Sequence, residues 1–154
     1  MTDMKRTLTV AAGLSLLGAC ITVPPAYADA QFTVTASGPS SLQAGLSGTY
    51  VVTALNDGDA APVQLFIVFA GELQQFGQIS ADGGFDCTAN ENTVRCTTPR
   101  LPSNVPTEIV VQGRGSERGA GQLVVNINPD RSIPEHTPPG GGTDNFAQKN
   151  VTIT

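Results

Sequence analysis

The sequence predicts an all-β domain: an antiparallel β-sandwich of about seven or eight strands with Greek-key connections. Three observations lead to this prediction. Short runs of residues alternate between apolar and polar side chains, turn-forming residues separate these runs, and no apolar set beyond the first thirty residues recurs with the spacing of a helix. Several connections are also longer than a simple meander needs, which favours a Greek key.

The expected strands follow in order along the chain. They are placed at residues 32–35, 49–55, 63–70, 84–88, 93–97, 107–112, 123–128 and 151–154, with a weaker segment at 73–76. Each run alternates with a period of two or is rich in β-branched and aromatic residues, as strands are. Turn formers such as Gly38-Pro39 and Asn56-Asp57-Gly58 separate them. The longest connection is expected between residues 128 and 146, where proline and glycine are frequent.

The first thirty residues have the pattern of a signal peptide. The basic pair Lys5-Arg6 precedes an uncharged apolar stretch at 7–23, and two prolines then lead to the small-x-small pattern Ala26-Tyr27-Ala28. Cleavage is expected after Ala28 or, in a second register, after Ala30, which leaves residues 31–154 as a single domain. A membrane anchor is the less favoured interpretation, because the apolar stretch is short for a hydrocarbon core of ~30 Å.

An alternative interpretation concerns Cys20. The stretch Leu17-Gly18-Ala19-Cys20 resembles a bacterial lipobox, in which cleavage precedes the cysteine and the cysteine then carries lipid. Lipid on Cys20 would be the expected contact with a membrane, since the rest of the sequence lacks a basic cluster or a long apolar run. Under both interpretations the protein is exported, to the cell envelope or the medium, and Cys87 and Cys96 are the remaining thiols.

Cys87 and Cys96 are expected to form a disulfide bond. Exported thiols become oxidised, the spacing is not the Cys-x-x-Cys of redox proteins, and a zinc site needs three or four ligands. A hairpin that turns at Glu91-Asn92 places Cys87 directly opposite Cys96, at a separation that disulfide geometry tolerates. The pair is therefore interpreted as a staple for this hairpin.

The domain also contains several short motifs in a distinctive order. They are Gly45, Tyr50, Asn56 with Gly58, Gly84-Phe85-x-Cys87, Val94-x-Cys96, Leu101-Pro102, Ile109-Val110-Val111, Asp144-Asn145 and Val151-Thr152-Ile153. In this order they resemble the conserved-repeat domain of bacterial surface and secreted proteins, over essentially the whole of residues 31–154. The resemblance implies an immunoglobulin-like fold and an extracytoplasmic scaffold or recognition role, with no catalytic residues. The chain departs from that family in carrying one copy and in having Pro102-Ser103 where a Pro-Gly turn is expected.

Composition and charge argue against several functions. The net charge is -5 and basic residues do not cluster, so nucleic acid is not an expected partner. The chain has no tryptophan, and Tyr50 is expected in the core, which disfavours a carbohydrate-binding platform. No Gly-x-Ser-x-Gly motif accompanies His136, the only histidine, which lies beside Glu135 in the long proline-rich loop. We therefore expect no enzyme activity.

Carboxylates gather loosely in three stretches of the sequence. The groups are Asp57 with Asp59, Asp82 with Asp86, and Asp130 with Glu135 and Asp144. Calcium is often bound by such oxygens, but no EF-hand loop is present, and turn-forming aspartates account for these positions. Neither a metal nor another cofactor is expected.

The strand expected at 63–70 has apolar side chains on both of its faces. Its odd-numbered residues form an apolar face for the core, while Phe66 and Val68 lie on the opposite face. These two side chains are either covered by a neighbouring loop or belong to an exposed apolar patch that binds a partner or a second copy. The favoured function is an exported interaction or scaffold module whose partner is an unknown protein or cell-envelope component. The alternative is a ligand-binding or inhibitor module that uses the 128–145 loop.

Overall fold

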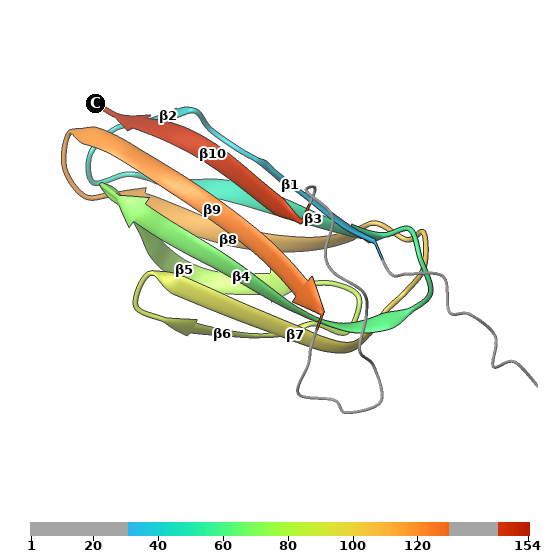
Figure 1. Cartoon of the computed structure of the whole chain (residues 1–154). Coiled ribbons are helices and arrows are strands. Elements are labelled where there is room, and N and C mark those ends of the chain that lie inside the picture. Colours follow the sequence, from blue (N-terminus) through green and yellow to red (C-terminus); the bar gives the residue numbers. More distant parts are fainter. Residues whose placement is uncertain (1–30, 130–144) are drawn as a thin grey trace, which may run out of the picture.

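The computed structural model describes residues 31–129 and 145–154, which form ten β-strands in two packed sheets (Figure 1). The strands are β1 (Phe32–Ser37), β2 (Ser41–Leu42), β3 (Ser47–Asn56), β4 (Ala61–Gly71), β5 (Leu73–Ala81), β6 (Asp86–Asn90), β7 (Thr93–Leu101), β8 (Thr107–Gly115), β9 (Gly119–Pro129) and β10 (Phe146–Ile153). Within these two ranges there is no helix, and so none long and apolar enough to cross a membrane.

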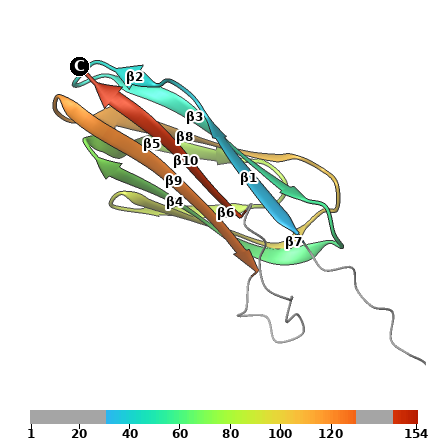
Figure 2. The ribbon, with the colours of Figure 1, turned by 45° about the horizontal axis from the view of Figure 1, so that its top comes forward.

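The two sheets have the arrangement of an immunoglobulin-like sandwich, which confirms the predicted fold class. One sheet has the order β1-β3-β8-β5 and the other the order β2-β10-β9-β4-β7-β6. All pairings are antiparallel except that of β2 with β10. Most consecutive strands lie in different sheets, so the chain crosses repeatedly between the layers, as in a Greek key. Figure 2 shows β1 running alongside β10, where the two sheets meet at one side.

The six-stranded sheet is wider than the three-stranded sheet of the simplest immunoglobulin domains. Strands β10, β9 and β4 occupy the place of that sheet, and the hairpin β6–β7 extends it beyond β4. Variable immunoglobulin domains carry two extra strands at this position, inserted directly after the equivalent of β4. Here the hairpin follows β5 instead, so the chain visits the opposite sheet before it returns.

Ten strands occur where about seven or eight are expected, and several are longer than predicted: β5 continues to Ala81, β7 continues to Leu101, and β9 begins at Gly119. Two further differences share one cause. Ser41, expected in the turn at 38–41, forms the short strand β2 together with Leu42, and β10 begins at Phe146 and not at Val151. In both places the strand is held by backbone hydrogen bonds to a neighbouring strand and not by burial of its side chains. Strand β2 pairs with β10 at only two residues. The first half of β10 has exposed polar side chains at alternate positions. Neither segment has the apolar alternation that predicts a strand from sequence.

The core lies between the sheets and is built from inward-facing alternate residues. The most deeply buried large side chains include Tyr50, Leu65, Ile67, Leu73, Leu101, Ile109, Leu123, Ile127 and Ile153. Val63, Leu65, Ile67 and Phe69 of β4 are all buried, as their alternation predicts. The predicted core position of Tyr50 is likewise correct.

Asn56, the last residue of β3, holds together the turns at one end of the sandwich. Its side chain is fully buried, and Nδ2 donates to the carbonyl oxygens of Asp59 (2.7 Å) and Leu101 (3.2 Å). Its Oδ1 accepts from the Gly58 N–H (3.0 Å), and its backbone carbonyl accepts from the Asn104 N–H (2.6 Å). The β3–β4 turn and the β7–β8 loop are thereby joined, which gives a physical reason for the Asn56 and Gly58 motif.

At the opposite end of β4, Gly71 lets the chain cross to the four-stranded sheet. Its φ is +63°, and a side chain there would collide with the carbonyl of Ala120. The next residue, Glu72, donates its N–H to the Ala120 carbonyl (3.0 Å), and its carboxylate accepts from the Ser116 hydroxyl (2.6 Å). The crossing is therefore fixed against the connection between β8 and β9.

Candidate functional site

The hairpin β6–β7 contains the disulfide bond that the sequence predicts. Cys87 and Cys96 face each other across the two strands, with a Cα–Cα distance of 4.0 Å, and their sulfurs are bonded. The turn consists of Glu91 and Asn92, and Glu91 adopts a positive φ of 52°. Cys96 is fully buried and Cys87 partly buried, so the bond fastens the outermost strand of the six-stranded sheet to the core.

Phe66 and Val68 lie on the outer face of the six-stranded sheet, as the alternation along β4 predicts, and both remain partly exposed. Val68 lies directly opposite Val124 of β9. Phe66 lies opposite Asn126, which in turn faces Phe146 of β10, a side chain that is 48% exposed. Because diagonal neighbours on one face of a sheet are close enough for large side chains to meet, these apolar residues form one surface. We call Phe66, Val68, Val124 and Phe146 the Phe66 patch.

Polar side chains border the Phe66 patch, among them several amides and Arg95, which lies directly opposite Phe66. On one side the Asn128 amide donates to Asn126, and the amide oxygen of Gln64 accepts from the guanidinium of Arg95. On the other side the Asn150 Oδ1 accepts from both Gln122 (3.0 Å) and Gln148 (3.1 Å). These bonds hold the polar side chains in fixed positions around the apolar centre. The outer face thus combines an apolar middle with a polar border, the arrangement typical of a protein interface.

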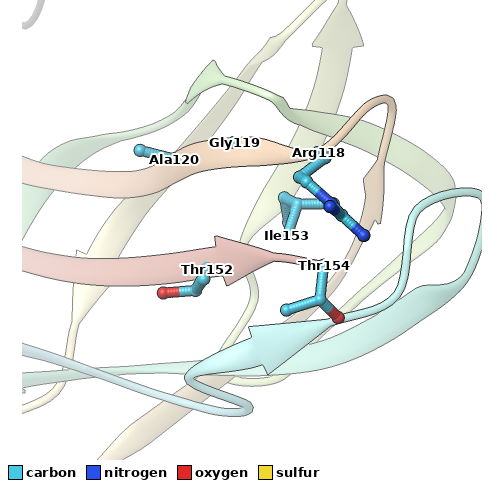
Figure 3. Close-up of a pocket in the computed structure, with 6 residues that line it drawn as sticks. All are labelled: Arg118, Gly119, Ala120, Thr152, Ile153 and Thr154. Carbon is cyan, nitrogen blue, oxygen red and sulfur yellow. The ribbon is translucent and has the colours of Figure 1, made fainter.

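A shallow hollow continues this face where β9 begins and β10 ends. Figure 3 shows its lining, in which Arg118 and Thr154 lie at one end near Ile153, and Ala120 and Thr152 lie at the other. One part, of about 480 Å³, is lined by Arg118, Gly119, Ala120, Thr152, Ile153 and Thr154. The adjoining part, of about 330 Å³, is lined by Ala70, Gly71, Ala120, Gly121, Gln122, Asn150, Val151 and Thr152. The surface is hollowed here because glycine and alanine replace the larger side chains of the Phe66 patch.

The titratable groups of the described residues do not converge on this face. Asp57, Asp59, Asp82 and Asp86 are exposed, and no cluster of three or more His, Cys, Asp or Glu side chains occurs within residues 31–129 and 145–154. Of these predicted loose groups, Asp57, Asp59 and Asp82 lie in turns between strands, whereas Asp86 begins β6. The pKa of Tyr50 is raised above its usual value because burial disfavours the charged phenolate. Its hydroxyl has no hydrogen-bond partner among the described residues.

Several residues singled out in the sequence lie outside the described part of the chain. They are the signal-peptide positions, Cys20 with its lipobox, and Asp130, Glu135, His136 and Asp144 of the long connection. The signal peptide, the lipidation of Cys20 and the use of the 128–145 loop therefore stay predictions.

Sequence reasoning found half of the Phe66 patch. It identified Phe66 and Val68 but not Val124 and Phe146, although Val124 alternates against the buried Leu123 and Val125 and so carried a usable signal. Phe146 carried none, because its neighbours in the sequence do not alternate. The hollow at the end of the face was also missed, since it depends on small residues from three strands.

Comparison with known proteins places the fold among immunoglobulin-like modules. No protein-family model matches the chain, and no curated protein sequence is recognisably similar. Among solved structures it is similar to the CARDB domain of a Pyrococcus furiosus protein, solved in complex with di-metal ions. That domain has 11% sequence identity and a TM-score of 0.59, and the match covers 83% of this chain and 91% of that chain.

A second similar structure is a non-cellulosomal cohesin from the archaeon Archaeoglobus fulgidus. It has 13% sequence identity and a TM-score of 0.56, over 80% of this chain and 91% of that chain. At such identities the likeness establishes the sandwich fold and not a shared activity. The resemblance to the bacterial conserved-repeat domain is thus supported for its immunoglobulin-like fold, and the family itself stays a prediction.

Proposed function

We propose that the protein is an exported, non-enzymatic interaction or scaffold module that binds a protein or another cell-envelope component through the outer face of its six-stranded sheet. The Phe66 patch carries this proposal. Two aromatic and two aliphatic side chains lie together on the surface. Contact between their apolar surface and water is unfavourable in free energy. Burial against a partner would recover that free energy.

The construction of the face supports binding more than chemistry. Strands β4 and β9, which carry three of the four patch residues, are paired on both sides, so little conformational entropy would be lost there on association. Phe66 and Phe146 would serve as aromatic anchors, and the hydrogen-bonded amides would form the surrounding polar rim. The carboxylates of the described residues form no cluster of three or more with His or Cys side chains, as a catalytic or metal site would need.

Export is supported by the disulfide bond, because such bonds persist in oxidising compartments. A metal-dependent role like that suggested by the di-metal complex of the CARDB domain gains no support from residues 31–129 and 145–154, where no cluster of metal-binding side chains is found. Intact-mass measurement of the protein recovered from its source would test export directly. A mass that includes residues 1–28 would contradict cleavage of the signal peptide, and a lipid on Cys20 would identify the lipoprotein form.

The interface is tested by paired substitutions on the two outer faces. Phe66→Ser and Val68→Ser alter the Phe66 patch, while Phe76→Ser and Val51→Ser alter comparable surface positions on the four-stranded sheet. The exported protein would be cross-linked in its native envelope, and its partner identified by mass spectrometry and then titrated against each variant. We expect the first pair to weaken binding at least tenfold and the second pair to leave it unchanged.

Equal binding by all four variants would contradict the proposed interface. Loss of binding on shortening the 128–145 loop, with Phe66→Ser neutral, would favour the ligand-binding or inhibitor alternative. Denaturant unfolding of each variant separates loss of binding from loss of folding. Size-exclusion chromatography at the same time would reveal whether the partner is a second copy.

A further inference from the structure

The outer edge of β10 is open along most of its length. Strand β9 pairs with the whole of β10, but on the other side β2 pairs only with Thr152 and Ile153. The segment from Phe146 to Asn150 therefore pairs with one strand among the described residues, and on its other side β1 of the four-stranded sheet runs close by without pairing with it (Figure 2). Free strand edges are places where a further strand can add.

The hydrogen bonds of β10 reveal which residues point towards this free side. Thr152 and Thr154 donate their N–H groups to Ser40 and Leu42, both at 2.9 Å, so even-numbered residues point away from β9. Asn145 directs its carbonyl towards β9, where it accepts from Ile127 at 2.9 Å. Because backbone groups alternate in direction along a strand, Phe146, Gln148 and Asn150 point their N–H and C=O groups outward. No backbone partner for these three residues occurs in the described part of the chain.

Most devices that normally block a free edge are missing from this segment. The sequence Phe146-Ala-Gln-Lys-Asn150 contains no proline or glycine, and its pairing with β9 runs without a bulge. The one protective feature is Lys149, which points to the inner side and is partly buried. Its Nζ donates to the Ser40 hydroxyl (2.9 Å), and no carboxylate pairs with it among the described residues.

We propose that the edge from Phe146 to Asn150 takes up an extended segment of a partner protein as an additional strand, with an acidic side chain of that segment opposite Lys149. This inference rests on the proposed binding function and extends it, because Phe146 belongs to both the edge and the Phe66 patch. The three outward-pointing residues offer six backbone hydrogen-bonding groups over about 17 Å of strand. An apolar residue opposite Phe146 would continue the patch onto the added strand.

The charges of the sheet favour an acidic partner segment over a second copy of the chain. The strands of the six-stranded sheet carry Arg95, Arg100 and Lys149 against the single carboxylate of Asp86. Two β10 strands paired about Gln148 would place their Lys149 side chains on the same side of the sheet, about 7–8 Å apart between diagonal positions.

Amide hydrogen exchange of the unmodified protein tests the premise. The amides of Phe146, Gln148 and Asn150 are expected to exchange quickly, whereas those of Ala147 and Lys149, which point towards β9, are expected to be protected. Equal protection of all five amides would mean that the edge is already covered, and would overturn the proposal.

Binding is tested with the peptide acetyl-Thr-Thr-Thr-Glu-Thr-Thr-Val-amide and a matched peptide with lysine in place of glutamate. In antiparallel pairing the glutamate faces Lys149 and the valine faces Phe146. We expect the first peptide to shift the amide signals of Phe146, Gln148 and Asn150 and to bind more tightly than the lysine peptide. Lys149→Glu should reverse this preference. Absence of shifts at millimolar peptide, or an unchanged preference in the variant, would overturn the proposal.

Gln148→Pro and Gln148→Ala form the matched pair for the backbone contact. Both remove the side-chain bond to Asn150, but only proline removes the outward N–H, and it leaves the pairing with β9 intact. Binding of the glutamate peptide should fall at least tenfold in Gln148→Pro relative to Gln148→Ala, and equal binding would refute edge pairing. A partner that is lost with Phe66→Ser but retained with Gln148→Pro would leave the proposed function standing and contradict only the edge inference.

Discussion

Replacement of Asn56 by alanine should be among the most damaging single changes to this domain that leave every apolar core residue in place. The side chain is fully buried and makes three hydrogen bonds, to the carbonyls of Asp59 and Leu101 and from the N–H of Gly58. Each such bond contributes about 1 kcal/mol net, and each partner left buried without a substitute adds a further cost. Gly58 is itself buried, so water cannot easily replace the lost acceptor.

The expected loss for Asn56→Ala is about 4 kcal/mol, out of a total stability on the order of 10 kcal/mol for a domain of this size. The midpoint of thermal unfolding should fall by about 15 °C, at roughly 4 °C per kcal/mol. Urea unfolding followed by circular dichroism measures the free energy, and Asn90→Ala is the control. Asn90 is exposed on the edge strand β6, and its replacement should change stability by less than about 0.5 kcal/mol. A loss below about 1 kcal/mol for Asn56→Ala would refute the argument that this side chain joins the two turns.

Three further changes test other parts of the fold. The double substitution of Cys87 and Cys96 by serine should lower the free energy of unfolding by about 2.5 kcal/mol, because the disulfide closes a short loop in the unfolded chain. Partner binding should stay intact. Loss of binding at retained stability would make the hairpin a recognition element. Glu91→Gly should raise stability by about 1 kcal/mol in urea unfolding, since Glu91 has a positive φ of 52°, and a loss would mean that its side chain has an unseen role. Tyr50→Phe should be neutral or stabilising by about 1 kcal/mol, because it removes a buried hydroxyl without a partner among the described residues; clear destabilisation would reveal a partner for that hydroxyl. Burial raises the pKa of Tyr50 in the folded protein. The stability that the neutral phenol contributes is therefore complete below the ordinary tyrosine pKa of about 10 and is lost as the pH rises above that value. The loss of stability at alkaline pH should be smaller in Tyr50→Phe.

The candidate site was predictable in part, and the missing part has a definite cause. Alternation along β4 identified Phe66 and Val68 as the outward pair, because which face a residue occupies depends only on its own strand. Which residues lie beside them depends on the register between strands that are distant in the chain. Val68 meets Val124, and Asn126 brings Phe146 into the row of Phe66, only because β9 pairs with both β4 and β10.

By itself, the sequence determined the fold class, the inward face of each well-patterned strand and the disulfide partners. These properties depend on local patterns: a period of two, turn residues that end a run, and a hairpin whose turn aligns Cys87 with Cys96. Only the tertiary structure decided the extent of β10, the pairing of β2, the composition of the Phe66 patch and the open edge at Phe146 to Asn150. The residues at that edge are mostly polar and do not alternate as a buried strand would. They form a strand because β9 supplies backbone hydrogen-bond partners, and the local sequence does not predict this pairing.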